Sequence, residues 1–262
     1  MEQYFYYIIL GSFSGTIAGL LGVGGGLVIV PLLSTLLLLI GVSPALVVHM
    51  AIGTSLATIV PTSVSSMWAH HKHHAVLWSV VVRITPGIII GALLGAWLAD
   101  RLASKQLSTV FALFEFTVAG WMVWGHIPDK AREHISNLTY GFAGLVIGTI
   151  SSLLGIGGGT MTVPFLSWSG TALPKAIGSS AACGLPIAIA GATGFVLTGI
   201  NETGLPTYSS GYLYWPAFVG IAITSIVFAP LGAKLAHRLP VSVLRKVFAG
   251  FLVLLGIRML LA

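Results

Sequence analysis

Charged side chains are scarce in this sequence, and their scarcity excludes most classes of protein. Only 7% of the 262 residues are Asp, Glu, Lys or Arg, whereas 56% are hydrophobic. A soluble domain carries about 25% charged residues, because a surface in water needs charge to stay dispersed. The composition therefore excludes a soluble globular protein and predicts an integral membrane protein.

Cysteine is almost missing, and so are the motifs of catalysis and metal binding. Cys183 is the only cysteine, so no disulfide can form within the chain. The sequence has no P-loop, no G-x-S-x-G elbow and no Cys/His zinc spacing, and the run HHKHH at 70–74 lacks an ordered ligand spacing. We therefore expect no enzymatic activity, no metal and no cofactor.

The basic residues do not indicate a nucleic-acid partner. The net charge is +6, but Lys and Arg sit in short gaps between apolar runs and form no basic stripe. This distribution is typical of topology signals in membrane proteins. We therefore expect the lipid bilayer and a small solute as partners, no nucleic acid, and a homo-oligomer as a further option.

Long apolar runs dominate what remains. A helix needs about 20 residues to cross the ~30 Å hydrocarbon core of a bilayer. About eight hydrophobic elements meet this requirement, so we predict an all-α integral membrane protein. The first and fifth elements are too long for one simple span, and each contains a glycine cluster. The elements are 5–40, 45–68, 78–99, 107–127, 138–168, 176–198, 213–235 and 243–262.

The sequence repeats itself in order. GLLGVGGGLVIVPLL, from Gly19, returns as SLLGIGGGTMTVPFL, from Ser152, with nine of fifteen positions identical. AIGTSLATIVP at 51–61 is then echoed by AIGSSAACGLP at 176–186. We therefore predict two homologous halves of four elements each, with a first transmembrane repeat at 1–128, a linker at 129–134 and a second repeat at 135–262. Paired, glycine-interrupted segments in such halves are typical of secondary transporters.

The glycine clusters predict broken helices at 22–26 and 155–159. Each glycine weakens a helix by about 1 kcal/mol relative to alanine, and a break inside the membrane must face protein or a water-filled cavity. Backbone N–H groups and the positive dipole end of the second half-helix can then hold an anion. Close packing of helices through small residues is the alternative reading. The candidate glycines are Gly22, Gly24, Gly25, Gly26, Gly155, Gly157, Gly158 and Gly159.

Small polar and basic residues near the clusters are further candidates for binding the anion. Hydroxyls can donate to an oxyanion, although Ser and Thr in a helix also bond to backbone carbonyls or bridge helices. A histidine could line the path, or could be an interfacial residue bonded to backbone, and an arginine near a span edge could pair with the anion. These candidates are Thr54, Ser55, Thr58, Ser179, Ser180, Cys183, His49 and Arg83.

Glu115 is a carboxyl in the middle of an apolar run. Ionisable residues within a membrane segment are rare and mark functional sites by default. Glu115 is therefore the candidate for carrying a coupling proton, and its counterpart in the second half is Leu252. The alternative is a structural pair with Arg83 or with a histidine.

The distribution of basic residues also predicts an orientation, if each broken element crosses the membrane once. The seven-to-five bias would then favour the first of the two sets below as cytoplasmic, with both termini outside. If the broken elements turn back instead, the assignment does not hold. The first set is Arg101, Lys105, Lys175, Lys234, Arg238, Arg245 and Lys246, and the second is Lys72, Arg83, Lys130, Arg132 and Arg258.

The paired motifs GLLGVGGG…VP and GIGGG…VP, followed by IGTS and IGSS, resemble those of the sulfite exporter TauE/SafE family. The resemblance covers essentially the whole chain. It implies an anion permease or exporter of the bacterial inner membrane, with sulfite, organosulfonates or related sulfur-containing anions as substrates. The glycine loops of the family would map onto Gly22–Gly26 and Gly155–Gly159.

We therefore expect a secondary transporter that moves a small sulfur-containing oxyanion by alternating access, with proton coupling. The alternative is a passive anion channel that uses the same glycine loops. A membrane-embedded enzyme would need a converging nucleophile or metal constellation, which the sequence lacks. A structural subunit would not need a broken helix in both halves.

Overall fold

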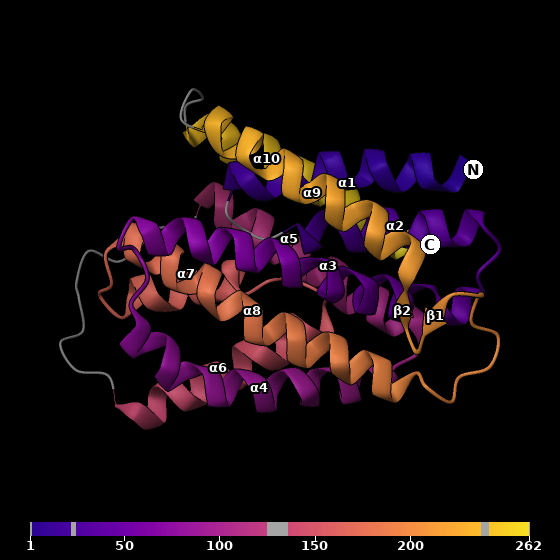
Figure 1. Cartoon of the computed structure of the whole chain (residues 1–262), viewed down its shortest axis with the longest axis horizontal. Helices are drawn as coiled ribbons and strands as arrows, with labels where there is room; N and C mark the ends of the chain where they lie inside the picture. The colour runs from indigo at the N-terminus through magenta and orange to yellow at the C-terminus, as the bar shows by residue number, and fades with distance from the viewer. Residues whose placement is uncertain (1, 22–24, 125–135, 237–240, 262) are drawn as a thin grey trace.

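Helices make up nearly all of the described part of the chain, which comprises residues 2–21, 25–124, 136–236 and 241–261 of the computed structural model (Figure 1). The prediction of an all-α protein is confirmed, and the first and fifth hydrophobic elements are each split into two helices at the glycine clusters. The elements are α1 Glu2–Leu21, α2 Gly26–Leu39, α3 Pro44–Lys72, α4 Trp78–Asp100, α5 Ser104–Trp124, α6 Asn137–Leu153, α7 Gly159–Trp168, α8 Leu173–Thr198, β1 Ser209–Ser210, β2 Leu213–Tyr214, α9 Trp215–Ala236 and α10 Val241–Leu261.

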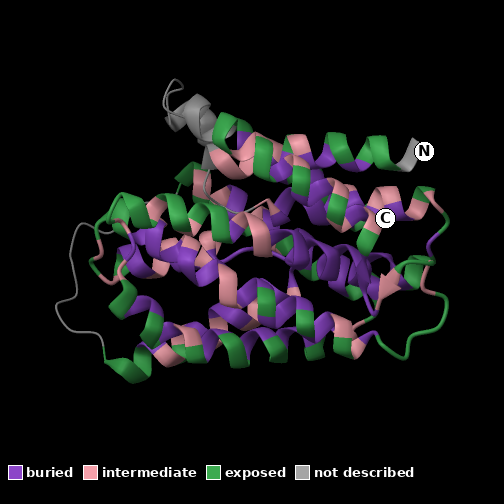
Figure 2. Cartoon of the chain, viewed as in Figure 1, coloured by how far each residue is buried: buried purple, intermediate pink, exposed green. Residues whose placement is uncertain are grey.

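Several of these helices suit a bilayer. Four of them, α3, α4, α5 and α8, are long and apolar enough to cross a membrane. Figure 2 shows α3 buried through the centre of the molecule, while the outward faces of α4 and α6 are exposed. The exposed face of α4 carries large apolar side chains, among them Ile90 and Trp97. Exposed apolar side chains on the outer helices are expected where lipid is the surrounding solvent.

Helix starts coincide with capping residues that the sequence supplies. At α3, the Ser43 Oγ accepts a hydrogen bond of 3.4 Å from the backbone N–H of Ala45, and Pro44 occupies the first helical position. At α6, the Ser136 Oγ accepts one of 3.1 Å from the N–H of Thr139. These side chains satisfy N–H groups that have no partner within the helix.

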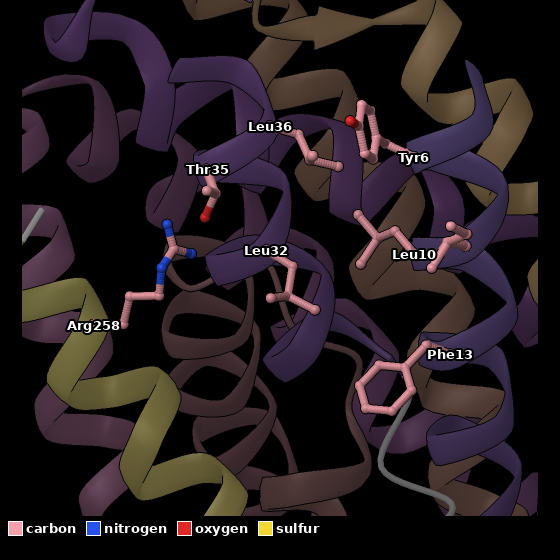
Figure 3. A pocket seen from close by; sticks show the side chains of 8 residues that line it. Tyr6, Leu10, Phe13, Leu32, Thr35, Leu36 and Arg258 are labelled. Atoms are coloured by element: carbon pink, nitrogen blue, oxygen red, sulfur yellow. The ribbon is translucent and has the colours of Figure 1, made fainter. Parts of the chain in front are cut away.

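Each broken element turns back on itself. Tyr6, near the start of α1, and Leu36, near the end of α2, line one groove, so the two helices run antiparallel (Figure 3). In the second half the rings of Tyr140, at the start of α6, and Phe165, near the end of α7, lie 6.0 Å apart. Each pair therefore returns toward the end of the molecule from which it started.

This turn corrects the expected grouping of the basic residues. Gly178, at the start of α8, packs against Ala75 in the α3–α4 turn, and the N–H of Leu77 donates to the Ser179 Oγ at 2.9 Å. The start of α8 and the end of α3 thus share one end of the molecule (Figure 1). The predicted grouping is wrong because it let each broken element cross once. Of the basic residues that the structure describes, the elements at the α3–α4 end carry Lys72, Arg83, Lys175, Lys234, Arg245 and Lys246, and those at the opposite end carry Arg101, Lys105 and Arg258. The remaining members of the predicted sets, Lys130, Arg132 and Arg238, lie outside the described residues.

The two sequence halves are interwoven. Five helices precede residues 125–135 and five follow them, and the expected linker at 129–134 lies outside the described residues. α1 lies along α9, and α6 lies along α4, so the first helix of each half packs against the other half. Glycines four residues apart make these contacts, and a Cβ at any of them would collide with the backbone of the facing helix. The contacts are Gly11 with Ile221, Gly15 with Ser225, Gly144 with Ile84 and Gly148 with Ile88.

Substitution of Gly148 by alanine should destabilise the protein, because the new Cβ would collide with the Ile88 carbonyl. We expect the free energy of unfolding to fall by about 1–3 kcal/mol, as for other overpacked sites. Gly141→Ala is the matched control in the same helix, since a Cβ there meets no atom within 4 Å. Thermal unfolding of the purified protein in detergent measures the difference, and equal midpoints for the two variants would contradict the close packing.

Candidate anion site at the glycine breaks

The second glycine motif begins by ending a helix. The N–H of Gly155 donates to the Ser152 carbonyl at 3.1 Å, and the N–H of Ile156 donates to the Ser151 carbonyl at 2.9 Å. Gly155 itself has a φ of +68°, a left-handed conformation that a side chain would strain. The first glycine of the motif therefore closes α6 with a C-terminal cap.

The same motif then starts a second helix. Gly158 is the N-cap of α7, with a φ of −58°, and its carbonyl accepts the N–H of Thr162 at 2.8 Å. Gly157 and Gly158 are buried. The first N–H groups of a helix have no carbonyl partner within it, and the helix dipole makes this end positive. The start of α7 is therefore a buried cluster of hydrogen-bond donors.

The breaks of the two halves meet. Gly26, the first residue of α2, packs against Gly155 and Ile156, and a Cβ on it would collide with the Gly155 carbonyl oxygen. That oxygen accepts a hydrogen bond of 2.8 Å from the Ser55 Oγ of α3. Gly25 is the N-cap of α2. The structure thus brings Gly26, Ser55 and the second motif together, whereas Gly22 and Gly24 lie outside the described residues.

Buried hydroxyls without a partner occur on the helices that meet at the second break, α6, α7 and α8. Thr162 and Ser151 are 0% exposed and Ser180 is 2% exposed, and their side-chain oxygens have no hydrogen-bond partner in the described structure. The Thr162 Oγ1 lies next to Gly158, 3.1 Å from the position that a Cβ there would take. A buried hydroxyl without a partner costs free energy, so these groups are suited to a ligand that accepts hydrogen bonds.

Thr162 and Ser151 could not be found by comparing the two halves of the sequence, because their counterparts in the first half are apolar. The first-half counterparts of Thr162 and Ser151 are Ile29 and Ala18. Neither position is therefore polar in both halves. The only available signal was the clustering of Ser and Thr beside the second glycine motif.

Thr54 and Ser179, by contrast, have their hydroxyls engaged by backbone. The N–H of Tyr214, just before α9, donates to the Thr54 Oγ1 at 3.0 Å. The N–H of Leu77, just before α4, donates to the Ser179 Oγ at 2.9 Å. The two hydroxyls hold equivalent helix starts in opposite halves. Their recurrence in the repeat is explained by this shared structural role.

Three further predicted site residues are Thr58, Cys183 and Arg83. The Thr58 Oγ1 donates to the Ser55 carbonyl at 2.7 Å, within α3. Cys183 is buried and free. Arg83 is exposed on α4. No hydrogen bond from Thr58, Cys183 or Arg83 to the second glycine motif is seen among the described residues.

His49, a residue of α3, is buried against the end of α4. Its Nε2 lies 3.0 Å from the Ala99 carbonyl oxygen and 3.1 Å from that of Leu102, and its Nδ1 lies 3.2 Å from the Ser104 Oγ. The ring of Tyr212 stacks on the imidazole with centroids 5.1 Å apart. His49 therefore joins α3 to the α4–α5 turn and to the hairpin formed by β1 and β2.

Tyr212 lies in the segment between α8 and α9. Its hydroxyl donates to the Asp100 Oδ1 at 3.1 Å and to the Glu202 Oε1 at 3.4 Å. Burial, together with the two carboxylates, raises the pKa of the Tyr212 phenol above its usual range. Tyr212 therefore remains a neutral donor that ties the hairpin to the end of α4.

Glu115 is buried in the middle of α5. It is 0% exposed, and neither carboxyl oxygen has a hydrogen-bond partner in the described structure. α5 packs mainly against α10, and also against α3. The expected alternative, a pair with Arg83 or with a histidine, is not seen among the described residues.

Comparison with known proteins identifies the family of this chain. The family model described as Sulfite exporter TauE/SafE matches residues 7–259. The chain belongs to this family. The resemblance inferred from the glycine motifs is therefore confirmed. No solved structure matches the chain significantly.

Curated relatives of this TauE/SafE-family chain carry transporter names. A "Probable membrane transporter protein" of Haemophilus influenzae is 39% identical, over 97% of each chain. Another, of Methanocaldococcus jannaschii, is 27% identical over 97% of this chain and 94% of its own. A third, of Bacillus subtilis, is 25% identical over 97% of this chain and 96% of its own. The family and these names indicate an integral membrane transporter and not an enzyme.

Removal of the Ser55 hydroxyl tests the contact between the two breaks. Ser55→Ala leaves the Gly155 carbonyl without the hydroxyl that donates to it, and an unpaired buried acceptor costs about 1–3 kcal/mol. Chemical unfolding of the purified TauE/SafE-family protein should show a loss of this size. Ser65→Ala, at an exposed position of the same helix, is the control and should be silent. Equal stability of the two variants would argue against the contact.

Proposed function

We propose that this transporter moves a small sulfur-containing oxyanion, such as sulfite or an organosulfonate, as an exporter or permease that works by alternating access. The observation that carries the proposal is the second glycine break, where α7 begins with the unpaired Thr162 hydroxyl in its first turns and Gly158 packs against Gly184 of α8, one turn beyond the unpaired Ser180. The sulfur chemistry comes from the family description, Sulfite exporter TauE/SafE.

The donors at this break suit an oxyanion. Helix N–H groups and hydroxyls donate hydrogen bonds, and an oxyanion offers several acceptor oxygens. The described residues named for this cradle, Gly155–Gly159, Thr162, Ser151 and Ser180, carry no charge. A neutral set of donors favours an anion without the strength of an ion pair, which suits a site that must also release its ligand.

The position of the site suits alternating access. The breaks of the two halves meet where Gly26 packs on Gly155, and α3 and α8 pack together at the centre of the molecule. Transporters built from repeats bind substrate at the interface between those repeats, at discontinuous helices. Movement of one half against the other would therefore open the cradle to either side in turn.

A proton is the proposed coupling ion, with Glu115 as its carrier. An unpaired carboxyl within a transmembrane segment is by default a functional group. A carboxyl that takes up a proton on one side and releases it on the other can link the pH gradient to anion movement. The absence of a partner for Glu115 among the described residues supports this role.

The orientation follows from the corrected grouping of basic residues. Among the described residues, six Lys and Arg lie on elements at the α3–α4 end, against three at the opposite end. By the positive-inside rule, the α3–α4 end faces the cytoplasm. The start of α1 and the end of α10 then face outward, and we place the protein in the bacterial inner membrane.

Flux measurements in proteoliposomes test the anion site. The protein should transport sulfite or a small sulfonate with saturation, whereas an ohmic current would instead indicate a channel. Thr162→Val and Ser180→Ala should each raise KM about tenfold, the effect of losing one hydrogen bond of about 1.4 kcal/mol. Thr117→Val, at an exposed threonine of α5, is the control. Unchanged KM in both cradle variants would rule out the proposed site.

The role of Glu115 has its own test. Glu115→Gln removes the titrating group but keeps its size, so an imposed pH gradient should no longer drive net uptake. Exchange of anion across the membrane without a gradient should persist, because the cradle is intact. Glu202→Gln, at an exposed carboxyl, should leave pH-driven uptake unchanged. Full pH-driven flux in Glu115→Gln would end the coupling proposal and leave the anion site standing.

A further inference from the structure

A groove of about 350 Å³ opens between α1, α2 and α10 (Figure 3). It contains none of the glycines at 22–26 or 155–159. Its lining is mostly aliphatic and aromatic, with Thr35, Tyr6 and Arg258 as the polar exceptions. The full lining is Tyr6, Ile9, Leu10, Phe13, Leu32, Thr35, Leu36 and Arg258.

Arg258 places a cation in the wall of this groove. One of its guanidinium N–H groups donates to the Pro31 carbonyl at 2.9 Å, and the Thr35 Oγ1 donates to the same oxygen at 2.9 Å. Among the described residues, no carboxylate forms an ion pair with it. A guanidinium has several N–H donors, so Arg258 keeps unused donors and an uncompensated charge. A charge within a transmembrane region usually has a partner.

Polarity changes along the groove. Figure 3 shows the Arg258 guanidinium beside Thr35, with Tyr6 near Leu36 toward the same end. Leu10 lies across the groove from Arg258, and Leu32 and Phe13 continue the groove away from the end with Tyr6 and Thr35. The polar end lies toward the end of the molecule where α1 begins and α10 finishes (Figure 1). The groove thus has a cationic head region near the membrane surface and an apolar tail region deeper in.

We propose that this groove binds an anionic membrane phospholipid, with one acyl chain along α1 and α2 and the headgroup phosphate at Arg258. Tyr6, Ile9 and Phe13 are about half exposed, at 49%, 49% and 44%, on a flank where lipid is the solvent. A guanidinium recognises phosphate through paired N–H···O bonds. The unpaired charge selects a headgroup with net negative charge over a zwitterionic one.

The helix α2 connects this groove to the proposed transport site. This helix forms one wall of the groove through Leu32 and Leu36, and it begins at Gly26, which packs on Gly155. A lipid between α1, α2 and α10 holds the half-helix whose first residue contacts the second break. Its binding is measured without any transport assay, so the lipid site and the proposed function stand or fall separately.

Native mass spectrometry of the full chain, incubated with phosphatidylglycerol or with phosphatidylcholine of the same acyl chains, tests the site. We expect about tenfold greater retention of phosphatidylglycerol, because only that headgroup has a net charge to pair with Arg258. Arg258→Gln should abolish the preference, and Arg258→Lys should keep most of it. Arg83→Gln, at an exposed arginine of α4 outside the groove, is the matched control and should behave as the unaltered protein.

A second variant probes the tail region. Leu32→Phe places a larger side chain in the groove and should reduce retention of both lipids without changing the headgroup preference. Circular dichroism checks the folding of each variant. If Arg258→Gln fails to fold, Arg258→Lys and Leu32→Phe decide the question.

Several outcomes would overturn the proposal. These are equal retention of the two lipids, an unchanged preference in Arg258→Gln or its loss in Arg83→Gln, and no effect of Leu32→Phe. Thermal protection by inorganic phosphate alone, equal to that by the lipid, would make Arg258 a free-anion site instead. A lipid-free dimer that dissociates in Leu32→Phe would show that a second copy of the chain covers the groove.

Discussion

Backbone groups in a membrane must find partners within the protein, and this constraint governs the whole arrangement. A helix that breaks inside hydrocarbon exposes N–H and C=O groups, each costing several kcal/mol if unpaired. Here, side chains of one half satisfy backbone groups of the other. Ser55 donates to the Gly155 carbonyl, Thr54 accepts from Tyr214 and Ser179 accepts from Leu77. The second break is held by Ser55 of the first half, and the starts of α9 and α4 are held by hydroxyls of the opposite half.

Glycine does two separate jobs in this structure. At the breaks it allows the turn of Gly155 and the contact of Gly26 with it. Along α1 and α6 it lets helices of opposite halves approach until backbone touches backbone. The first helix of each half therefore finds its main packing partner in the other half. The same residue type builds the candidate site and makes the two halves depend on each other for their packing.

Much of the architecture could be predicted from the sequence because its signals are local. Apolar runs identify the eight elements, and the glycine clusters identify where two of them split. The direction of α2 and α7 after the splits could not be predicted, since an apolar run has the same composition in either direction. Only some residues of the candidate site could be predicted from the sequence. Repetition pointed to Thr54 and Ser179, which cap helices, while Thr162 has Ile29 as its counterpart and gave no repeat signal.

The return of each broken element toward its starting end has a consequence for how the two halves face the membrane. Five helices follow one another in each half, and α1 begins at one end of the molecule while α6 begins at the other. The second half therefore runs in the opposite direction to the first along the molecule, as in the inverted repeats of many transporters. In the proposed mechanism, a difference in shape between the halves would open the molecule to one side. Under the proposed alternating access, exchanging that difference between the halves would open the molecule to the other side, so one asymmetry would account for both states of the transport cycle.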